Sequence, residues 1–301
     1  MNILKSALIL SFLITIMFSC KKKSDDVQPP VTTSGYKLIF KFHFDSTQVR
    51  LNNFGQATGL AAGHAGQSPR FNVLSSHYLE LSPDSLTSLG SGKVLYRAPE
   101  TSIGGSNAID FDSSVAVGEG QTFLSVPLSN VNAGTYKWLR LSLAYQNYDI
   151  NYRFYLSGNP VDNTGTIAAF IGFNSYIRSY HIKDSLVTVN SNKLQGYWVF
   201  ETSYLGFGNV SQGQAPPGAT TVPNPLSFTS PVPAGSCVVT GAFPFPLVIT
   251  GNETHDITVL VSVSTNKSFE WIDPNSNGIF EPLNGDTVVD MGVRGLIPVV
   301  Q

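Results

Sequence analysis

Cysteine is nearly absent from this chain, which limits how a fold can be stabilised. The 301 residues include only Cys20 and Cys237. Cys20 directly follows an apolar N-terminal run that resembles a signal segment, which makes it an unsuitable disulfide partner. Cys237 is then the only cysteine left in the folded part. An internal disulfide is therefore excluded, and stability must come from core packing or a bound metal. Cys237 itself lies in a strand-like run, 235–240, and is expected to be buried as a small apolar residue.

Charge is also scarce. Asp, Glu, Lys and Arg make up 13% of the chain, against about a quarter in typical soluble domains. The 18 basic and 20 acidic residues give a formal charge of −2, and no basic stripe is present. Nucleic acid is therefore not an expected partner. Ser, Thr, Asn, Gly and aromatic residues replace the charges, a mixture common in extracellular β proteins.

Catalytic signatures are missing as well. Gly-x-Ser-x-Gly does not occur, and none of the five histidines lies in a His-Glu-x-x-His pattern. Asp110 and Asp112 are expected on one face of a strand, where a carboxylate pair could serve glycoside hydrolysis. A solvated strand face is the simpler interpretation of this pair. The sequence thus favours a protein that is not an enzyme, with a glycan hydrolase as a third-ranked alternative.

The N-terminal segment indicates where the protein is located. Lys5 precedes an apolar run from Ala7 to Phe18 that ends at Ser19-Cys20. The run is shorter than the roughly 20 residues needed to span a bilayer, but it suits a signal peptide. Residues 1–19 resemble a bacterial lipoprotein signal, although Met17 and Phe18 depart from the usual Leu-small-small-Cys pattern. An ordinary secretory signal or an N-terminal anchor is the alternative.

This resemblance implies that Cys20 is lipidated, for example with palmitate, and anchors the chain in the lipid bilayer. Lys21-Lys-Lys-Ser-Asp-Asp26 resembles the signals that carry lipoproteins of Bacteroidota to the outer face of the outer membrane. The alternative is that these residues are a solvated, charged tether and not a targeting signal. Residues 20–35, which include Pro29-Pro30 and Thr32-Thr-Ser34, are then a spacer ahead of the folded part.

Residues 36–301 carry the pattern of an all-β fold. Tyr36, Leu38, Phe40, Phe42 and Phe44 alternate with more polar residues, which is typical of a half-buried strand. Many similar short runs, separated by Gly, Pro and Asn turns, predict an antiparallel β-sandwich of immunoglobulin or jelly-roll type. No helical stripe follows the signal. The segment 166–180 is expected to form a pair of strands turning at 172–174, with one short helix as the alternative.

Two regions are expected to lack regular structure. Residues 49–68, rich in Gly, Ala and Asn, predict a long loop that carries His64. Residues 206–234 hold six prolines, which remove ladder donors. They predict a surface loop or a join that would divide the domain into two packed β subdomains.

A candidate metal loop lies near the C-terminus. Hard oxygen donors alternate there and are followed by Gly278, where a calcium loop turns sharply. The predicted Ca²⁺ ligands are Asp273, Asn275, Asn277, the Ile279 carbonyl, Glu281 and Asp286. Position 12 of the loop is Asn284 rather than Glu, and Pro282 blocks a following helix, so the loop resembles those of extracellular β proteins more than an EF-hand. A polar Asn/Gly turn without metal is the alternative.

His43 and His77 form a second candidate site, because both are expected on strands and could meet across a sheet as copper or zinc ligands. The strand at 36–44 and the turn Asn132-Ala-Gly-Thr-Tyr136 resemble the β-sandwich of methanobactin-associated copper-binding lipoproteins over residues 36–145. The ligands of that family have no residue-by-residue match here. Trp138, Trp198 and Trp271 could contribute to a sugar-stacking platform, although most aromatic residues are expected in the core.

We therefore expect a lipid-anchored, non-enzymatic β-sandwich, stabilised by Ca²⁺, that binds a glycan or a surface protein. A copper-binding lipoprotein is the alternative.

Overall fold

The all-β prediction is confirmed by a computed structural model, which describes residues 35–52, 56–215 and 236–301. Within these residues there is no α-helix, and the only helical turns are two short 3₁₀ segments, Phe111–Ser113 and Leu128–Asn130. Residues 35–301 form one compact unit. The predicted signal, Cys20 and the tether up to residue 34 lie outside the described residues, as do residues 216–234 of the proline-rich segment.

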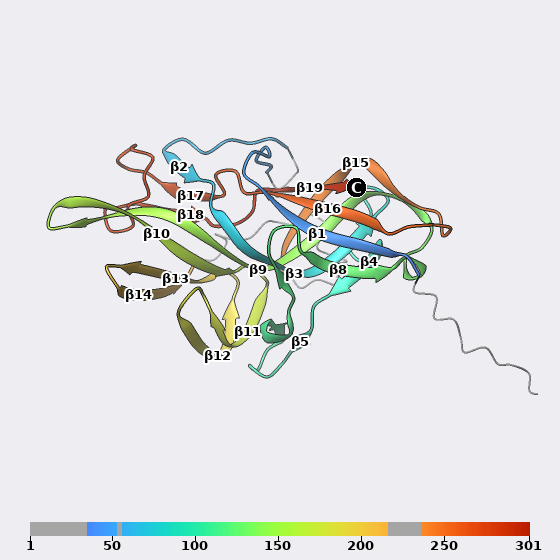
Figure 1. Cartoon of the computed structure of the whole chain (residues 1–301), viewed down its shortest axis with the longest axis horizontal. Helices are drawn as coiled ribbons and strands as arrows, with labels where there is room; N and C mark the ends of the chain where they lie inside the picture. The colour runs from blue at the N-terminus through green and yellow to red at the C-terminus, as the bar shows by residue number, and fades with distance from the viewer. Residues whose placement is uncertain (1–34, 53–55, 216–235) are drawn as a thin grey trace, which may run out of the picture. The chain divides into compact units, whose positions relative to one another are not determined.

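The strands of the described residues form four sheets (Figure 1). The first sheet has the order β19 (Leu296–Val300), β16 (Ile257–Ser264), β1 (Lys37–Asp45) and β8 (Thr122–Pro127). The largest sheet has the order β14 (Phe207–Gln214), β13 (Tyr197–Tyr204), β10 (Asn159–Phe170), β9 (Gly134–Leu156), β3 (Arg70–Ser82) and β4 (Lys93–Arg97), with β15 (Cys237–Ile249) added to β9 and β7 (Ala116–Val117) added to β3. Most pairs are antiparallel.

The two smaller sheets are attached to this framework. One has the order β12 (Leu186–Leu194), β11 (Asn174–His181), β6 (Ala108–Asp110) and β5 (Glu100–Thr101). The other has the order β18 (Thr287–Asp290), β17 (Phe269–Ile272) and β2 (His64–Gln67). Two pairs are parallel, β1 with β16 and β6 with β11.

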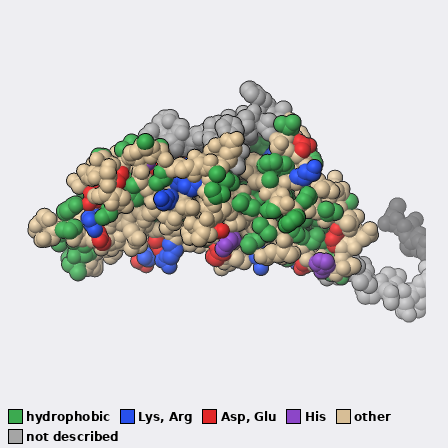
Figure 2. All heavy atoms as spheres, turned by 90° about the horizontal axis from the view of Figure 1, so that it is seen from above, with side chains coloured by type: hydrophobic (Ala, Val, Ile, Leu, Met, Phe, Trp, Pro, Cys, Tyr) green, Lys and Arg blue, Asp and Glu red, His purple; other side chains and the backbone are tan. Residues whose placement is uncertain are grey.

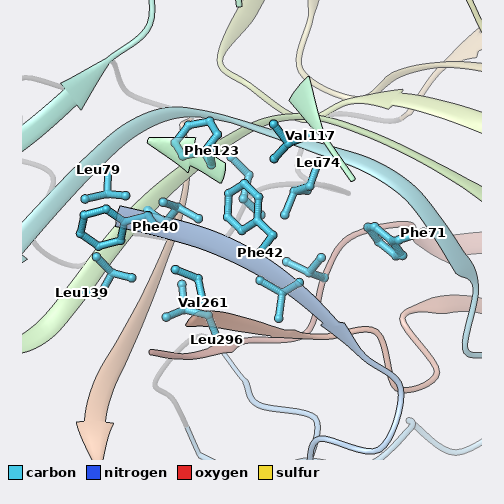
Figure 3. Packing of buried hydrophobic residues seen from close by; sticks show 14 of the residues in the cluster. Phe40, Phe42, Phe71, Leu74, Leu79, Val117, Phe123, Leu139, Val261 and Leu296 are labelled. Carbon is cyan, nitrogen blue, oxygen red and sulfur yellow. The ribbon is translucent and has the colours of Figure 1, made fainter. Parts of the chain in front are cut away.

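The core lies between the first sheet and the largest one. Leu38, Phe40 and Phe42 of β1 are buried as their alternation predicts, whereas Tyr36, on the same predicted face, is exposed. Figure 3 shows Phe40 and Phe42 among side chains from β3, β9, β16 and β19. The rings of Phe42 and Phe123 lie 5.0 Å apart, centroid to centroid. The aromatic strand predicted from the sequence is therefore the centre of the core.

Strand β9 is buried on both faces. Leu139, Leu141 and Leu143 belong to the main core, as their pattern predicts. Tyr145, which projects to the other face, packs with Phe170 and Tyr180 in a second cluster beneath the β5–β6–β11–β12 sheet. The largest sheet is thus covered on both sides along its middle strands. Every residue from Leu139 to Ile150 is consequently buried.

Several local predictions are wrong in informative ways. The segment 166–180 does form strands, but β10 and β11 belong to different sheets and do not pair with each other. The predicted loop at 49–68 contains β2, and the predicted irregular region from 206 begins with β14. Asp110 ends β6 and Asp112 lies in a 3₁₀ turn, so they do not share a strand face. Sequence alternation does not reveal these short or polar edge strands because little of their surface is buried.

Candidate metal loop and adjacent cleft

The predicted metal loop joins two paired strands. It occupies residues 273–286, between the end of β17 at Ile272 and the start of β18 at Thr287. Trp271 is 1% exposed, and its ring lies 5.4 Å from that of Phe280, which also packs on Phe269 at 4.9 Å. The main chain of Arg153 in β9 donates a hydrogen bond to the carbonyl of Phe280 (2.8 Å). These contacts fix the start and the middle of the loop against the main core.

The first half of the loop turns as a calcium loop would. Asp273 is 5% exposed, and its Oδ2 accepts a hydrogen bond from the Gly278 N–H (2.8 Å). Ser276 and Gly278 both have positive φ, +52° and +70°, so the chain reverses sharply between them. The other carboxylate oxygen, Asp273 Oδ1, is buried and has no hydrogen-bond partner among the described residues. The turn therefore uses one oxygen of Asp273 and leaves the second free of protein partners.

The second half of the loop is organised around Glu281, which is 1% exposed. Its Oε1 accepts from the Tyr155 hydroxyl (2.8 Å), and its Oε2 accepts from the side-chain amides of Asn277 (3.2 Å) and Asn284 (3.1 Å). These hydrogen bonds, first that of Asn284 and then that of Tyr155, lower the pKa of Glu281. Glu281 is thus held as a carboxylate by neutral donors.

Asp286 completes the loop. Its Oδ2 accepts the Glu281 N–H (2.7 Å), while its Oδ1 is buried without a partner among the described residues. Burial raises the pKa of Asp286, and the nearby charges of Asp273 and Glu281 raise it further. The negative charges of Asp273 and Glu281 therefore act on Asp286, which has no basic partner among the described residues.

A hard cation would supply the missing charge. Buried polar atoms are almost always hydrogen-bonded, so the two unpartnered carboxylate oxygens of this loop are candidate ligands for a cation. Two other predicted ligands, Asn275 and Asn277, are exposed to solvent. The side-chain oxygen of Asn277 already accepts a hydrogen bond from the Ile279 N–H (2.8 Å). Among the described residues, no three His, Cys, Asp or Glu side chains are gathered as a metal group. Asn oxygens and main-chain carbonyls would have to complete the coordination, as Ca²⁺ readily allows.

The histidines of the alternative copper site lie in different sheets. His43, on β1, has its Nδ1 2.6 Å from Glu119 Oε1 and is partly exposed. His77, on β3, is fully buried, with its Nε2 2.8 Å from Glu100 Oε1, and burial lowers its pKa. Neither β1–β3 pairing nor a shared carboxylate links the two side chains.

Sequence reasoning missed a buried ionic cluster near the metal loop. Glu270 is 5% exposed, with one oxygen 2.6 Å from His64 Nδ1 and the other 2.6 Å from Arg50 Nη2. Arg294 also contacts Glu270 (3.3 Å) and pairs with Asp290. These partners are up to 220 residues apart in sequence. No local spacing pattern could have indicated them.

A cleft of about 370 Å³ lies beside the metal loop. Its walls come from β10, β13, the edge strand β14 and the segment from Phe280 to Met291, so the loop residues Phe280, Pro282 and Asp286 also line the cleft. Trp198 lines it and is half-buried, whereas Trp271 belongs to the core. On the face seen in Figure 2, hydrophobic side chains gather over one half, and charged side chains are scattered without a continuous basic stripe.

Comparison of the chain with known protein families, with curated proteins and with solved structures finds no match. In the described part of the chain, no helix is long and apolar enough to cross a membrane.

Proposed function

We propose that this protein is a lipid-anchored, extracytoplasmic binding protein whose β-sandwich holds a structural Ca²⁺ ion in the loop 273–286. The pair of buried carboxylate oxygens without protein partners, Asp273 Oδ1 and Asp286 Oδ1, carries the metal part of the proposal. Anchoring through Cys20 at the outer membrane, with exposure on the cell surface, rests on the N-terminal sequence.

The proposed ion stabilises a loop that cannot be held by a disulfide. Cys237 is 7% exposed within the core, and burial raises the pKa of its thiol to about 12, so it is an inert apolar residue. With three carboxylates in the loop and an extracellular setting, the expected dissociation constant is on the order of 10⁻⁴ to 10⁻⁵ M. The hydrogen-bond donors to Glu281 are the uncharged side chains of Tyr155, Asn277 and Asn284, so they do not neutralise the negative charge that would attract the ion.

Equilibrium dialysis against labelled calcium tests this site directly. The chain from residue 27 onward should bind one Ca²⁺ ion, and Asp273→Asn should abolish binding because it removes a charged ligand while keeping an acceptor for Gly278. Asp112→Asn is the matched control, since Asp112 lies outside the loop and pairs with Arg178 (2.6 Å). Wild-type protein that binds no Ca²⁺ at millimolar concentrations would contradict the proposed site.

The binding role without catalysis is the second part of the proposal. Asp110 and Asp112, the candidate carboxylate pair for hydrolysis, have separate local partners, Ser113 for Asp110 and Arg178 for Asp112. A glycan array followed by product analysis tests this part, since a bound sugar that is left intact supports it and a hydrolysed sugar contradicts it. A surface-protein partner is the other ligand class for the same module.

The copper-binding alternative has less structural support. His43 and His77 each contact a different glutamate and lie on strands of different sheets. Elemental analysis of protein from copper-supplemented cells distinguishes this alternative, which requires copper in the wild type and its loss in His77→Phe.

A further inference from the structure

The cleft beside the metal loop has the size and surface of a small-molecule site. Its volume of about 370 Å³ falls within the range of roughly 300–1,000 Å³ that is usual for ligand pockets. Phe280 and Met291 contribute buried side chains, while Trp198 and Phe200 stand half-buried at its wall. Apolar atoms make up most of its surface. Covering such an apolar surface with an apolar ligand removes it from water, which lowers the free energy of the complex.

The wall formed by Trp198 is built by close packing. Trp198 pairs with Gly213 of β14, and a Cβ added at Gly213 would lie 2.5 Å from the indole ring. The ring therefore lies directly against the backbone of the edge strand, a position that only glycine permits. An indole held in this way presents a rigid aromatic surface.

The charges in the lining have one sign. Asp286 and Asp290 line the cleft, whereas no Lys, Arg or His of the described part of the chain does so. Asp290 is paired with Arg294 and accepts the Gly292 N–H (2.7 Å), whereas Asp286 keeps one oxygen unpartnered. An anionic ligand would add another negative charge to this poorly solvated surface.

Polar groups that could recognise a sugar are few. Among the described residues, Ser211 and Gln214 of β14 and Thr287 of β18 are the uncharged polar side chains in the lining. A sugar buried here would leave most of its hydroxyls without partners, at a cost of about 1–3 kcal/mol each. The cleft is therefore unsuited to a glycan.

We infer that this cleft binds a small aromatic molecule that carries no negative charge. The inference goes beyond the proposed function, because it names a ligand class other than a glycan or a surface protein, and it does not require the calcium site to be correct. Trp198 and Phe200 stack on the ligand, and Met291 and Phe280 form the apolar floor.

A matched pair of fluorescent probes tests the inference. N-phenyl-1-naphthylamine is neutral and aromatic and has one N–H, and 8-anilinonaphthalene-1-sulfonate has the same rings with an added sulfonate. Titration of the chain from residue 27 onward should show saturable binding of the neutral probe at one site per chain. The sulfonate should bind at least about tenfold more weakly, which corresponds to 1.4 kcal/mol.

Variants on the edge strand locate the binding. Ser211→Trp places an indole in the cleft and should weaken binding of the neutral probe at least tenfold. Val210→Trp is the matched control, because Val210 is the preceding residue of β14, is exposed and does not line the cleft. It should leave the affinity unchanged. Melting curves establish that both variants are folded.

Three outcomes would overturn the inference: no saturable binding of the neutral probe to wild type, equal affinity for the two probes, or full affinity in folded Ser211→Trp. Each can occur while Ca²⁺ still binds and stabilises the loop, so this failure is distinguishable from failure of the proposed calcium site. Conversely, loss of the calcium site with intact probe binding would leave the cleft inference in place.

Discussion

At the scale of single residues, the loop 273–286 holds several negatively charged side chains that repel one another. Asp273 and Asp286 each use one carboxylate oxygen to hold the turn and leave the other buried without a protein partner. Such an arrangement destabilises the empty loop, because buried charges of like sign repel one another. It stabilises the loop once a cation binds.

Replacing Asp286 with Asn should therefore change stability in opposite directions in the two conditions. In chelator, Asp286→Asn should raise the melting temperature at pH 7, because it removes a carboxylate whose pKa is raised in the folded state. In Ca²⁺, the same variant should melt below wild type, because a ligand is lost.

The pH dependence provides the control. A raised folded-state pKa means that the folded protein binds a proton before the unfolded chain does, so wild type in chelator gains stability as pH falls through that pKa. The Asp286→Asn variant lacks this gain. A decrease of the melting temperature in both chelator and Ca²⁺ would contradict the account of the loop.

His77 gives a second residue-scale prediction. Burial lowers its pKa in the folded state, so below the unfolded value of about 6.5 the unfolded chain takes up the proton first. Stability is therefore lost as pH falls from about 6.5 toward the folded pKa. Between pH 7.5 and 5.5 the loss should reach at most about 1.4 kcal/mol.

His77→Phe should remove this part of the pH dependence, as measured by denaturant unfolding at the two pH values. His181→Gln, at an exposed position, is the control and should keep the wild-type slope. An unchanged slope in folded His77→Phe would show that His77 is not the group responsible.

At the scale of elements, sequence patterns predicted the strands that bury an alternating face. Strand β1 and strand β16, with Val259, Val261 and Val263 buried, are clear in the sequence because period-two alternation marks a strand buried on one face. Strand β14 was missed because its sequence, Phe207–Gln214, is polar and Gly-rich and lies at a sheet edge. Its pairing with β13 depends on the turn at Leu205 and Gly206, both with positive φ.

The candidate site was predicted only where its donors are close in sequence. The loop 273–286 could be recognised because the spacing of Asp, Asn and Gly residues is itself the signal. The cleft could not, because Trp198, Ser211 and Met291 meet only through the pairing of distant strands. The cluster of Glu270 with Arg50 and His64 is hidden for the same reason.

The position of β1 makes an element-scale prediction. This strand pairs with β16 on one side and β8 on the other, and its Leu38, Phe40 and Phe42 lie in the main core. Removing residues 1–34 should leave the melting temperature unchanged, whereas removing residues 1–45 should abolish cooperative folding. Circular dichroism and thermal melting of the two truncations check this. A folded chain without residues 1–45 would contradict the role given to β1.

At the scale of the whole molecule, residues 35–301 form a single compact unit, and the anchor at Cys20 is the part that we propose from the sequence. In a host that processes lipoproteins, Cys20→Ala should abolish labelling with a palmitate analogue and release the protein from the membrane fraction. Cys237→Ala is the control, because Cys237 is buried in the core, and it should keep both the label and the membrane location. Labelling that survives Cys20→Ala would contradict the anchor.

Thermal melting of the chain from residue 27 onward, in Ca²⁺ and in chelator, tests the central claim most directly. At a concentration 100 times the dissociation constant, binding to the folded state adds about 2.7 kcal/mol of stability. Each kcal/mol corresponds to about 2–4 °C for a domain of this size class. The account predicts that Ca²⁺ raises the melting temperature by several degrees and that Asp273→Ala removes this shift. Equal melting temperatures of the wild type in Ca²⁺ and in chelator would contradict it.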